Sequence, residues 1–109
     1  KPAQLKIKEA ELLLNTVPKG AVLVAMDRSG RALASEDLAK KLSALQDDGI
    51  SEIAFVIGGS DGLDKSILVR AQLKIALGAM TWPHMLARVM LIEQIYRAQC
   101  ILSNHPYHK

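Results

Sequence analysis

The sequence predicts an α/β fold, in which helices alternate with the strands of a mainly parallel sheet. Two short apolar runs, AVLVAM at 21–26 and IAFVI at 53–57, are bounded by turn residues, as is typical of strands buried on both faces. Segments with a helical spacing of apolar residues lie before, between and after these runs. Strands that alternate with helices pair in parallel through right-handed crossovers. The 109 residues suffice for one domain, and the chain contains no internal repeat or linker.

The first half of the chain predicts a helix, a strand and a second helix. A helical spacing runs over Gln4–Leu14, and the first strand covers Ala21–Met26. Asp27-Arg28-Ser29-Gly30 has the composition of a turn. Ser35 is expected to cap the next helix, whose first turn holds two acidic residues at the positive end of the helix dipole.

The second half predicts two further strands and two further helices. The second buried strand is Ile53–Ile57, and Asp64 is expected to cap a helix over Lys65–Ile75. Leu77–Met80 is short enough to be a third strand. The longest helix is expected at His84–Leu102, after the helix-breaking Thr81-Trp82-Pro83.

Composition and charge exclude several classes of protein. Half of the residues are hydrophobic and 23% are charged, which excludes a disordered tail, and the single cysteine, Cys100, excludes an internal disulfide. A net charge of +3 permits RNA binding without arguing for it. The most apolar stretch, 85–102, carries too many polar residues for a membrane span, and we expect no signal sequence. We therefore expect a soluble, cytoplasmic protein.

Gly58-Gly59-Ser60-Asp61-Gly62 is the most informative loop, because it follows a buried strand and precedes a helix. Open α/β sheets bind ligands at such positions. The spacing matches neither G-x-G-x-x-G nor a P-loop, so a phosphate site and a purely structural turn both remain open. Asp27 also follows a strand, and a role in the turn competes there with a catalytic one. Trp82 suits either the core or contact with an adenine face.

The C-terminal tail, 103–109, is unusually rich in His, Tyr and Asn, which suit contacts to bases and phosphates. His105 and His108 could bind a metal by their spacing, but no third ligand is evident, and we expect no metal site. Arg88 and Arg97 lie on the longest helix, where RNA contact, an intersubunit anchor and a solvated face all remain possible.

Three motifs resemble one family when they are taken together: FVIGGSDG at 55–62, MTWPHMLARVMLIEQIYRA at 80–98 and NHPYHK at 104–109. In this order they resemble the bacterial ribosomal RNA large subunit methyltransferase H family, and the resemblance covers roughly residues 22–109. It implies an S-adenosylmethionine-dependent pseudouridine N3-methyltransferase of the SPOUT class. The family's fold is an α/β knot: a mainly parallel sheet with helices on both faces and a C-terminal trefoil knot.

The resemblance also implies partners. The family works as a homodimer with the long C-terminal helix at the interface, and its substrate is a pseudouridine of 23S rRNA in the assembled ribosome. Neither DNA nor a membrane is expected as a partner. One subunit's tail is expected to complete the other's site.

The resemblance assigns the site residues. The expected cofactor contacts are Met26, Gly58, Leu77, Gly78, Ala79, Met80, Thr81 and Trp82. Methylation at N3 requires loss of the imide proton, and the tail offers His105, Tyr107 and His108 as acceptors. Arg88 is expected to hold a phosphate or to stabilise negative charge on the base.

One departure from the family supports an alternative function. Family members usually carry an additional N-terminal strand–helix unit, so 1–109 is expected to be a single SPOUT methyltransferase domain that lacks this unit. Together with the small net charge, this leaves open a non-catalytic RNA-binding or ribosome-assembly module with the same fold.

Overall fold

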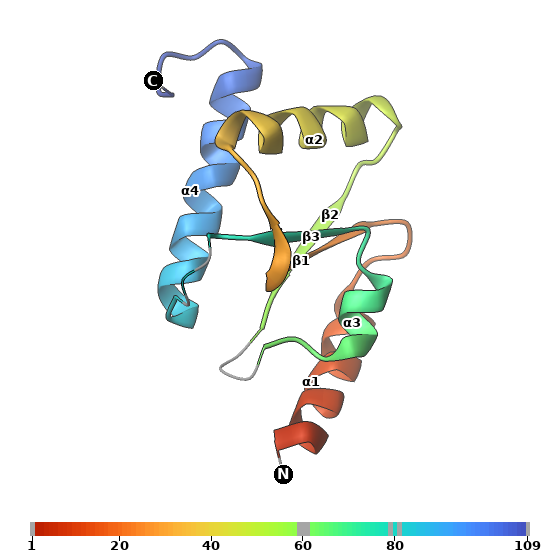
Figure 1. Cartoon of the computed structure of the whole chain (residues 1–109). Helices are drawn as coiled ribbons and strands as arrows, with labels where there is room; N and C mark the ends of the chain where they lie inside the picture. Colours follow the sequence, from red (N-terminus) through yellow and green to blue (C-terminus); the bar gives the residue numbers. More distant parts are fainter. Residues whose placement is uncertain (1, 59–61, 79, 81, 109) are drawn as a thin grey trace.

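The computed structural model describes residues 2–58, 62–78, 80 and 82–108. Its elements follow the predicted alternation of helices and strands (Figure 1). In chain order they are α1 Pro2–Thr16, β1 Val22–Ala32, α2 Ser35–Asp47, β2 Ile53–Ile57, α3 Lys65–Arg70, β3 Leu73–Ala76 and α4 His84–Leu102. The predicted α/β class is confirmed, as are the bounds of β2 and α4.

The three described strands form one parallel sheet in the order β2-β1-β3. Val24 of β1 is paired with Phe55 of β2 on one side and with Leu73 of β3 on the other. β1 is therefore the central strand, and Val22–Met26 are all buried. β2 is less buried than its apolar sequence predicted, since only Val56 of this strand is fully buried and no described strand covers its outer edge.

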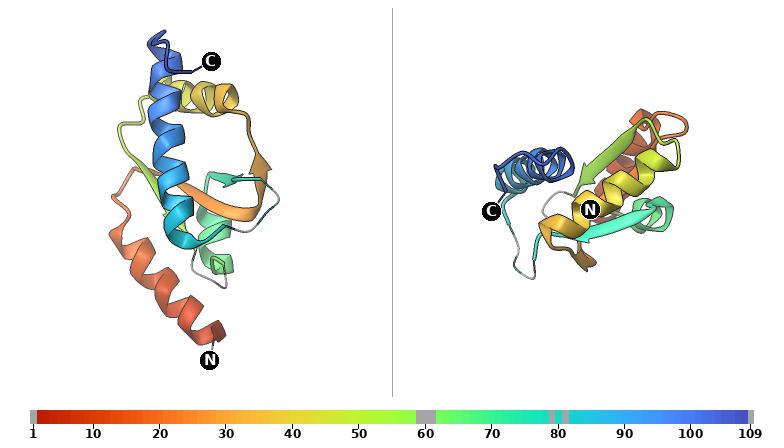
Figure 2. Two further views of the ribbon diagram at one scale, coloured as in Figure 1. Left: turned by 90° about the vertical axis from the view of Figure 1, so that its left-hand side faces the viewer. Right: turned by 90° about the horizontal axis from the view of Figure 1, so that it is seen from above.

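Helices cover both faces of the sheet, which makes the domain a three-layer α/β/α sandwich (Figure 2). The side chains of Val22, Val24 and Met26 point to the face covered by α2 and α4. Leu23 and Ala25 point to the opposite face, where α1 and α3 pack. Burial of an aliphatic side chain stabilises a fold by about 1.5–3 kcal/mol, so this alternation holds the sheet between its two helical layers.

The third strand lies earlier in the chain than the sequence predicted. The helix expected over Lys65–Ile75 ends at Arg70, and the strand expected at Leu77–Met80 is found at Leu73–Ala76. Gln72 explains the shift, because its backbone N–H donates to the Leu23 carbonyl at 2.9 Å and its side-chain Oε1 accepts from the Leu23 N–H at 2.8 Å. These contacts dock the chain onto β1 before a longer helix can form.

The turn expected at Asp27-Arg28-Ser29-Gly30 lies inside β1 as an irregularity of the strand. Met26 and Arg31 both pair with Ile75, so the intervening residues loop out of the ladder. The Asp27 carboxylate accepts a hydrogen bond from the Ser29 N–H at 3.0 Å, which is the turn role weighed for it. Gly30 lies so close to β3 that an added Cβ would be 2.5 Å from the carbonyl carbon of Lys74.

The two predicted helix caps have different outcomes. Asp64 caps α3, where its carboxylate accepts from the Ser66 N–H at 3.0 Å. Ser35 does not cap α2, because Ala34 occupies that position and Ser35 is the first helical residue. Its hydroxyl donates instead to Oε1 of Gln94 on α4, at 2.6 Å. Among the described residues, no helix is long and apolar enough to cross a membrane.

Candidate active site

The carboxyl ends of the three strands lie at one edge of the sheet, and the segments that follow them form the candidate active site. β1 reaches its irregular segment after Met26, β2 leads into Gly58, and β3 leads into Leu77. Ligands of open α/β sheets bind outside the carboxyl ends of the strands. The fold therefore brings together loops that are distant in sequence.

Gly58, the first residue after β2, has no room for a side chain. An added Cβ would lie 2.6 Å from the carbonyl carbon of Gly62 and 2.8 Å from the nitrogen of Leu63. Gly62 has a φ of 79°, a conformation that glycine adopts without strain. The two ends of the predicted glycine loop thus pack backbone against backbone, whereas residues 59–61 lie outside the described part of the chain.

Asp27 connects the end of β1 to this loop. Burial alone would raise its pKa, but hydrogen bonds from the side chain and backbone of Ser29 and from the backbone of Leu63 outweigh burial. The pKa of Asp27 therefore lies below its ordinary value of 3.8. The carboxylate is ionised at neutral pH and tethers two of the three segments that follow the strands.

Trp82 and His84 shape the segment between β3 and α4. The indole Nε1 of Trp82 donates to the carbonyl oxygen of Leu77 at 2.9 Å, which turns the segment back on itself. Nδ1 of His84 lies 3.0 Å from the Gly58 carbonyl oxygen, and it must be the donor because a carbonyl only accepts. Trp82 is 37% exposed, so it is not a core residue.

A cavity of about 560 Å³ opens between these segments, and we call it the glycine-loop cavity. Its volume lies within the range of about 300–1,000 Å³ typical of small-molecule sites. Six of the eight predicted cofactor residues line it: Met26, Gly58, Leu77, Gly78, Met80 and Trp82. The other two, Ala79 and Thr81, lie outside the described residues. Lys6, Asp27 and Arg28 give this cavity its charged lining.

A second cavity of about 640 Å³ adjoins the first, and we call it the α4 cavity. The two cavities share four lining residues: Met26, Ile75, Leu77 and Gly78. The rest of the α4 cavity is formed by residues around the start of α2 and by the middle of α4. Its lining is apolar at Leu33, Leu38 and Leu91 and polar at four residues: Ser35, Glu93, Gln94 and Arg97.

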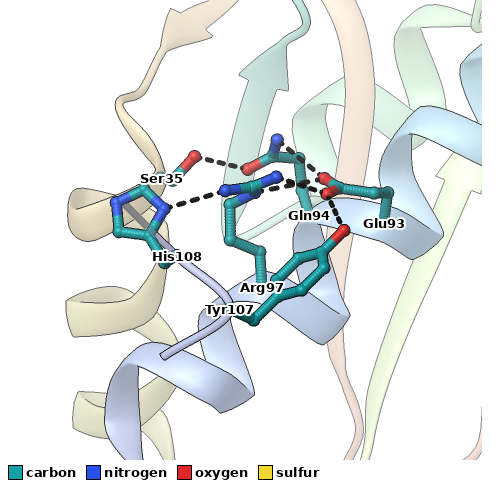
Figure 3. A network of polar contacts seen from close by, with 6 residues as sticks. All are labelled: Ser35, Glu93, Gln94, Arg97, Tyr107 and His108. Carbon is teal, nitrogen blue, oxygen red and sulfur yellow. Dashed lines mark hydrogen bonds and ion pairs between the residues drawn. The ribbon is translucent and has the colours of Figure 1, made fainter. Parts of the chain in front are cut away.

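A polar network joins the C-terminal tail to this second cavity (Figure 3). Glu93 is at its centre: Nη2 of Arg97 donates to Oε2 at 2.6 Å, and the Tyr107 hydroxyl donates to the same oxygen at 2.8 Å. Oε1 accepts from Nε2 of Gln94 at 3.1 Å and from Nε of Arg97 at 3.4 Å. The Arg97 guanidinium also lies 4.9 Å from the centre of the Tyr107 ring. The hydrogen bonds from Arg97 and Tyr107 lower the pKa of Glu93.

His108 extends the network to α2. Its Nδ1 lies 3.0 Å from Nη1 of Arg97, and its Nε2 lies 2.9 Å from Oε2 of Glu36. Because arginine can only donate, Nδ1 must accept, and Nε2 carries the hydrogen that is donated to Glu36. In this arrangement the imidazole is neutral, and its lone pair is engaged by Arg97.

The predicted catalytic residues fall into two groups. Tyr107 and His108 contact Glu93 and Arg97, which line the α4 cavity. His105 and Arg88 are exposed and line neither cavity. Nδ1 of His105 accepts from the backbone N–H of Tyr107 at 3.2 Å, so this side chain shapes the tail in the present conformation.

Sequence reasoning missed Ser35, Glu93 and Gln94 as site residues. In the sequence, Arg97 is a candidate for RNA contact or an intersubunit anchor, and no local pattern distinguishes Glu93. Gln94 has no local signal, and the sequence predicts a helix cap at Ser35. Among the described residues, no group of three His, Cys, Asp or Glu side chains is placed to hold a metal ion.

Helices on both faces of a parallel sheet, with a glycine-lined cavity beyond the carboxyl ends of its strands, define an open α/β protein, a class whose ligands bind at this edge of the sheet. A sequence model described as "Predicted SPOUT methyltransferase" matches residues 1–108. The chain belongs to the SPOUT methyltransferase family, and it is a methyltransferase.

Curated relatives narrow the family further. A protein from Rhodospirillum centenum is 58% identical over 106 residues, which cover 97% of this chain and 70% of the relative. Proteins from Dinoroseobacter shibae and Paramagnetospirillum magneticum are each 51% identical, over 95% and 97% of this chain and 67% and 70% of their own lengths. All three are named ribosomal RNA large subunit methyltransferase H. The resemblance seen in the three sequence motifs is thereby confirmed.

Proposed function

We propose that this chain methylates N3 of a pseudouridine in 23S rRNA of the assembled ribosome, with S-adenosylmethionine as the methyl donor. One observation carries the proposal: residues from the ends of all three strands, assigned to the cofactor from the sequence, line a single cavity. The names of the relatives support ribosomal RNA as the substrate. Membership of a methyltransferase family favours this function over a non-catalytic module.

The glycine-loop cavity suits an adenosine with an amino-acid tail. Ile57, Leu63 and Met80 offer apolar surface to a planar base. The absence of a side chain at Gly58 lets the backbone of Gly62 and Leu63 pack against it, which sets the shape of this cavity wall. Leu77 and Gly78 follow β3 directly, and the Trp82–Leu77 hydrogen bond fixes the shape of the segment that they begin.

The sulfonium supplies an already activated methyl group, so the protein's main task is to position the two reactants. When bound, S-adenosylmethionine would supply this methyl group to N3, and the N3 proton would have to pass to an acceptor of the protein. Arg97 is suited to stabilise negative charge on the imide oxygens, because it lines the α4 cavity and is held by Glu93.

We place the group that accepts the N3 proton in the C-terminal tail, at Tyr107 or His108. The Tyr107 hydroxyl donates a hydrogen bond to Glu93, and this hydrogen bond raises the pKa of Tyr107. His108 directs its lone pair to Arg97. The lone pair of His108 is freed from Arg97, and the hydroxyl of Tyr107 from Glu93, only when the tail leaves this network, which fits the expectation that the tail completes the site of a second subunit. Arg88, exposed on the first half of α4, is placed to meet an RNA phosphate.

A homodimer formed through α4 is part of the proposal. Met85, Val89, Ile92 and Tyr96 recur at helical spacing and are 66%, 61%, 62% and 49% exposed. A stripe of large apolar side chains on one face of a helix is typical of an interface. A second copy of the chain would cover it.

The trefoil knot and the place of action complete the proposal. Membership of the SPOUT methyltransferase family supports a knotted path for the C-terminal part of the chain. An enzyme that methylates ribosomal RNA works where ribosomes are, in the cytoplasm.

Two experiments test the function. Trp82 is the only tryptophan of the chain and lines the glycine-loop cavity, so its fluorescence should change when S-adenosylmethionine is added. Ribosomes that lack the modification should then receive radioactive methyl groups from the cofactor, and mass spectrometry should identify 3-methylpseudouridine in 23S rRNA. Cofactor binding without methylation of ribosomes would contradict the proposed substrate, and no binding by the folded protein would contradict the cofactor site.

A further inference from the structure

We propose that the α4 cavity receives the acceptor base and that Ser35 and Gln94 determine the preference for pseudouridine over uridine. This inference rests on the proposed function. The two cavities share Met26, Ile75, Leu77 and Gly78, so they adjoin along these residues. Reacting atoms must approach to about 3–3.5 Å, so we place the acceptor base at the border that the two cavities share.

The lining of the α4 cavity suits a planar pyrimidine. Leu33, Leu38 and Leu91 provide apolar contact for the faces of a base. The polar groups come from the start of α2 and from α4, where they can reach the edge of the ring. A base that is splayed out of an RNA strand is recognised by this combination of face contacts and hydrogen bonds to its edge.

Glu93 does not read the base, because its carboxylate is already saturated. Each carboxylate oxygen accepts two hydrogen bonds: Oε2 from Arg97 and Tyr107, and Oε1 from Gln94 and Arg97. A carboxylate has about four acceptor positions, and all of them are occupied. Glu93 is therefore a positioning residue that fixes the side chains of Arg97 and Gln94.

Ser35 and Gln94 keep hydrogen-bonding capacity for a ligand. Oε1 of Gln94 accepts from the Ser35 hydroxyl at 2.6 Å, and one of the two Nε2 hydrogens is donated to Glu93. These bonds fix the orientation of the amide and leave one Nε2 hydrogen to donate. The Ser35 oxygen has donated its hydrogen and keeps its lone pairs to accept. The pair thus offers a hydrogen-bond acceptor beside a donor.

This pair complements an edge that uridine lacks. In pseudouridine the ring is attached through carbon, so N1 carries a hydrogen next to the C2 carbonyl oxygen. We assign Ser35 Oγ to accept from N1–H and Gln94 Nε2 to donate to O2. In uridine N1 bears the ribose, and the acceptor of Ser35 would be left without a partner, which lowers affinity for the wrong base.

The test compares ribosomes that carry pseudouridine or uridine at the methylated position, with tritiated S-adenosylmethionine as donor. Ser35→Ala and Gln94→Met should each lower the ratio of the two transfer rates by about three- to tenfold. Ser35→Thr, which keeps the hydroxyl, should restore the ratio. Since Ser35 is not the cap of α2, its replacement by Ala leaves the helix start intact. Ser43→Ala on α2 and Gln99→Leu on α4 are matched controls that line neither cavity, and they should leave the ratio unchanged.

The outcomes separate this inference from the function on which it rests. An unchanged ratio in both variants overturns the inference, whether transfer to the two substrates is retained or is lost equally. In either case, the proposed function still holds if the wild-type protein methylates ribosomes. If the wild-type protein methylates neither kind of ribosome, the proposed function fails and the inference fails with it.

Discussion

The indole Nε1 of Trp82 donates a hydrogen bond to the carbonyl oxygen of Leu77, across the segment that connects β3 to α4. Both residues line the glycine-loop cavity, so this bond shapes a wall of the proposed cofactor site. Trp82→Phe removes the donor but keeps an aromatic ring. We expect cofactor affinity to fall about three- to tenfold, because one hydrogen bond contributes about 0.5–1.5 kcal/mol.

Isothermal titration calorimetry with S-adenosylmethionine measures this effect. Leu86→Ala is a suitable control, since Leu86 is 44% exposed on α4 and lines neither cavity. Wild-type affinity in a folded Trp82→Phe protein would show that the bond does not shape the site.

Gly58→Ala is expected to abolish cofactor binding. A Cβ at this position would lie 2.6 Å from the Gly62 carbonyl carbon, so the two ends of the glycine loop must move apart. Overpacking of this kind destabilises a fold by about 1–3 kcal/mol. Gly58→Arg should act in the same way, since the backbone clash begins at Cβ, before the longer side chain fills the cavity.

Gly20→Ala separates the local effect from general destabilisation. Gly20 has a φ of 86° and no atom within 4 Å of an added Cβ, so its replacement strains the backbone without affecting the cavity. The cost of strain is about 1–2 kcal/mol. Urea denaturation should show that both variants are destabilised, whereas calorimetry should detect cofactor binding only in Gly20→Ala. Binding by Gly58→Ala would contradict the role of the close backbone contact.

Ile92→Asp should convert the proposed homodimer into a monomer. Ile92 lies within the apolar stripe of α4, and a carboxylate buried there without a partner disfavours association. Leu12→Asp on α1 is the matched control, because Leu12 is 69% exposed and lies outside the stripe. Sedimentation velocity measures the outcome. Equal sedimentation of the Ile92→Asp, Leu12→Asp and wild-type proteins would exclude α4 as the interface.

The central strand, β2 and α4 could be predicted from the sequence because their signals are local. The apolar runs at 21–26 and 53–57 mark strands, and the turn residues beside the second run mark its ends, whereas those after the first run lie inside β1. The register of β3 could not be predicted in this way. It depends on hydrogen bonds between Gln72 and Leu23, which are 49 residues apart, in a segment that also has helical spacing.

The candidate site likewise contains residues that a local pattern predicts and residues whose role depends on contacts that are distant in sequence. Gly58 stood out because it follows a buried strand and precedes a helix, where open α/β sheets bind ligands, and the family resemblance supplied its cofactor role and the other cofactor residues. The role of Glu93 as the centre of a network depends on Tyr107, 14 residues away, and the role of His108 depends on Glu36, 72 residues away. Ser35 was read as a helix cap because no local pattern reveals its tertiary contact with Gln94.

The attachment of the tail to α4 should be lost at both extremes of pH. The pKa of Glu93 is lowered from its ordinary value of 4.5, first by the hydrogen bond from Arg97 and then by that from Tyr107. Its contribution to stability is therefore present above pH 4.5 and is lost as pH falls through the lowered pKa. The hydrogen bond from Tyr107 to Glu93 also raises the pKa of Tyr107 above 10.0. The contribution of Tyr107 to stability is therefore present below pH 10.0 and is lost as pH rises through the raised pKa.

Carbon-13 NMR spectra of labelled tyrosine rings measure both the acid and the alkaline release of the tail. The Tyr107 ring packs edge-on against the Tyr96 ring, with 4.9 Å between the ring centres, so its signal should change when the tail leaves. Tyr107→Phe keeps the ring but has no hydroxyl to ionise. With labelled phenylalanine, this variant should lose the alkaline transition of the tail and should release the tail at a higher pH on the acid side, because Glu93 loses a donor.

The pKa of Tyr96 is also raised, through its hydrogen bond with Cys100, so Tyr96→Phe is the control and should keep the transition of Tyr107. Glu36→Gln removes the second carboxylate that holds the tail, which leaves Glu93 to determine the acid transition. A Tyr107 ring signal that does not change between pH 3 and pH 12 would show that this hydrogen bond does not hold the tail.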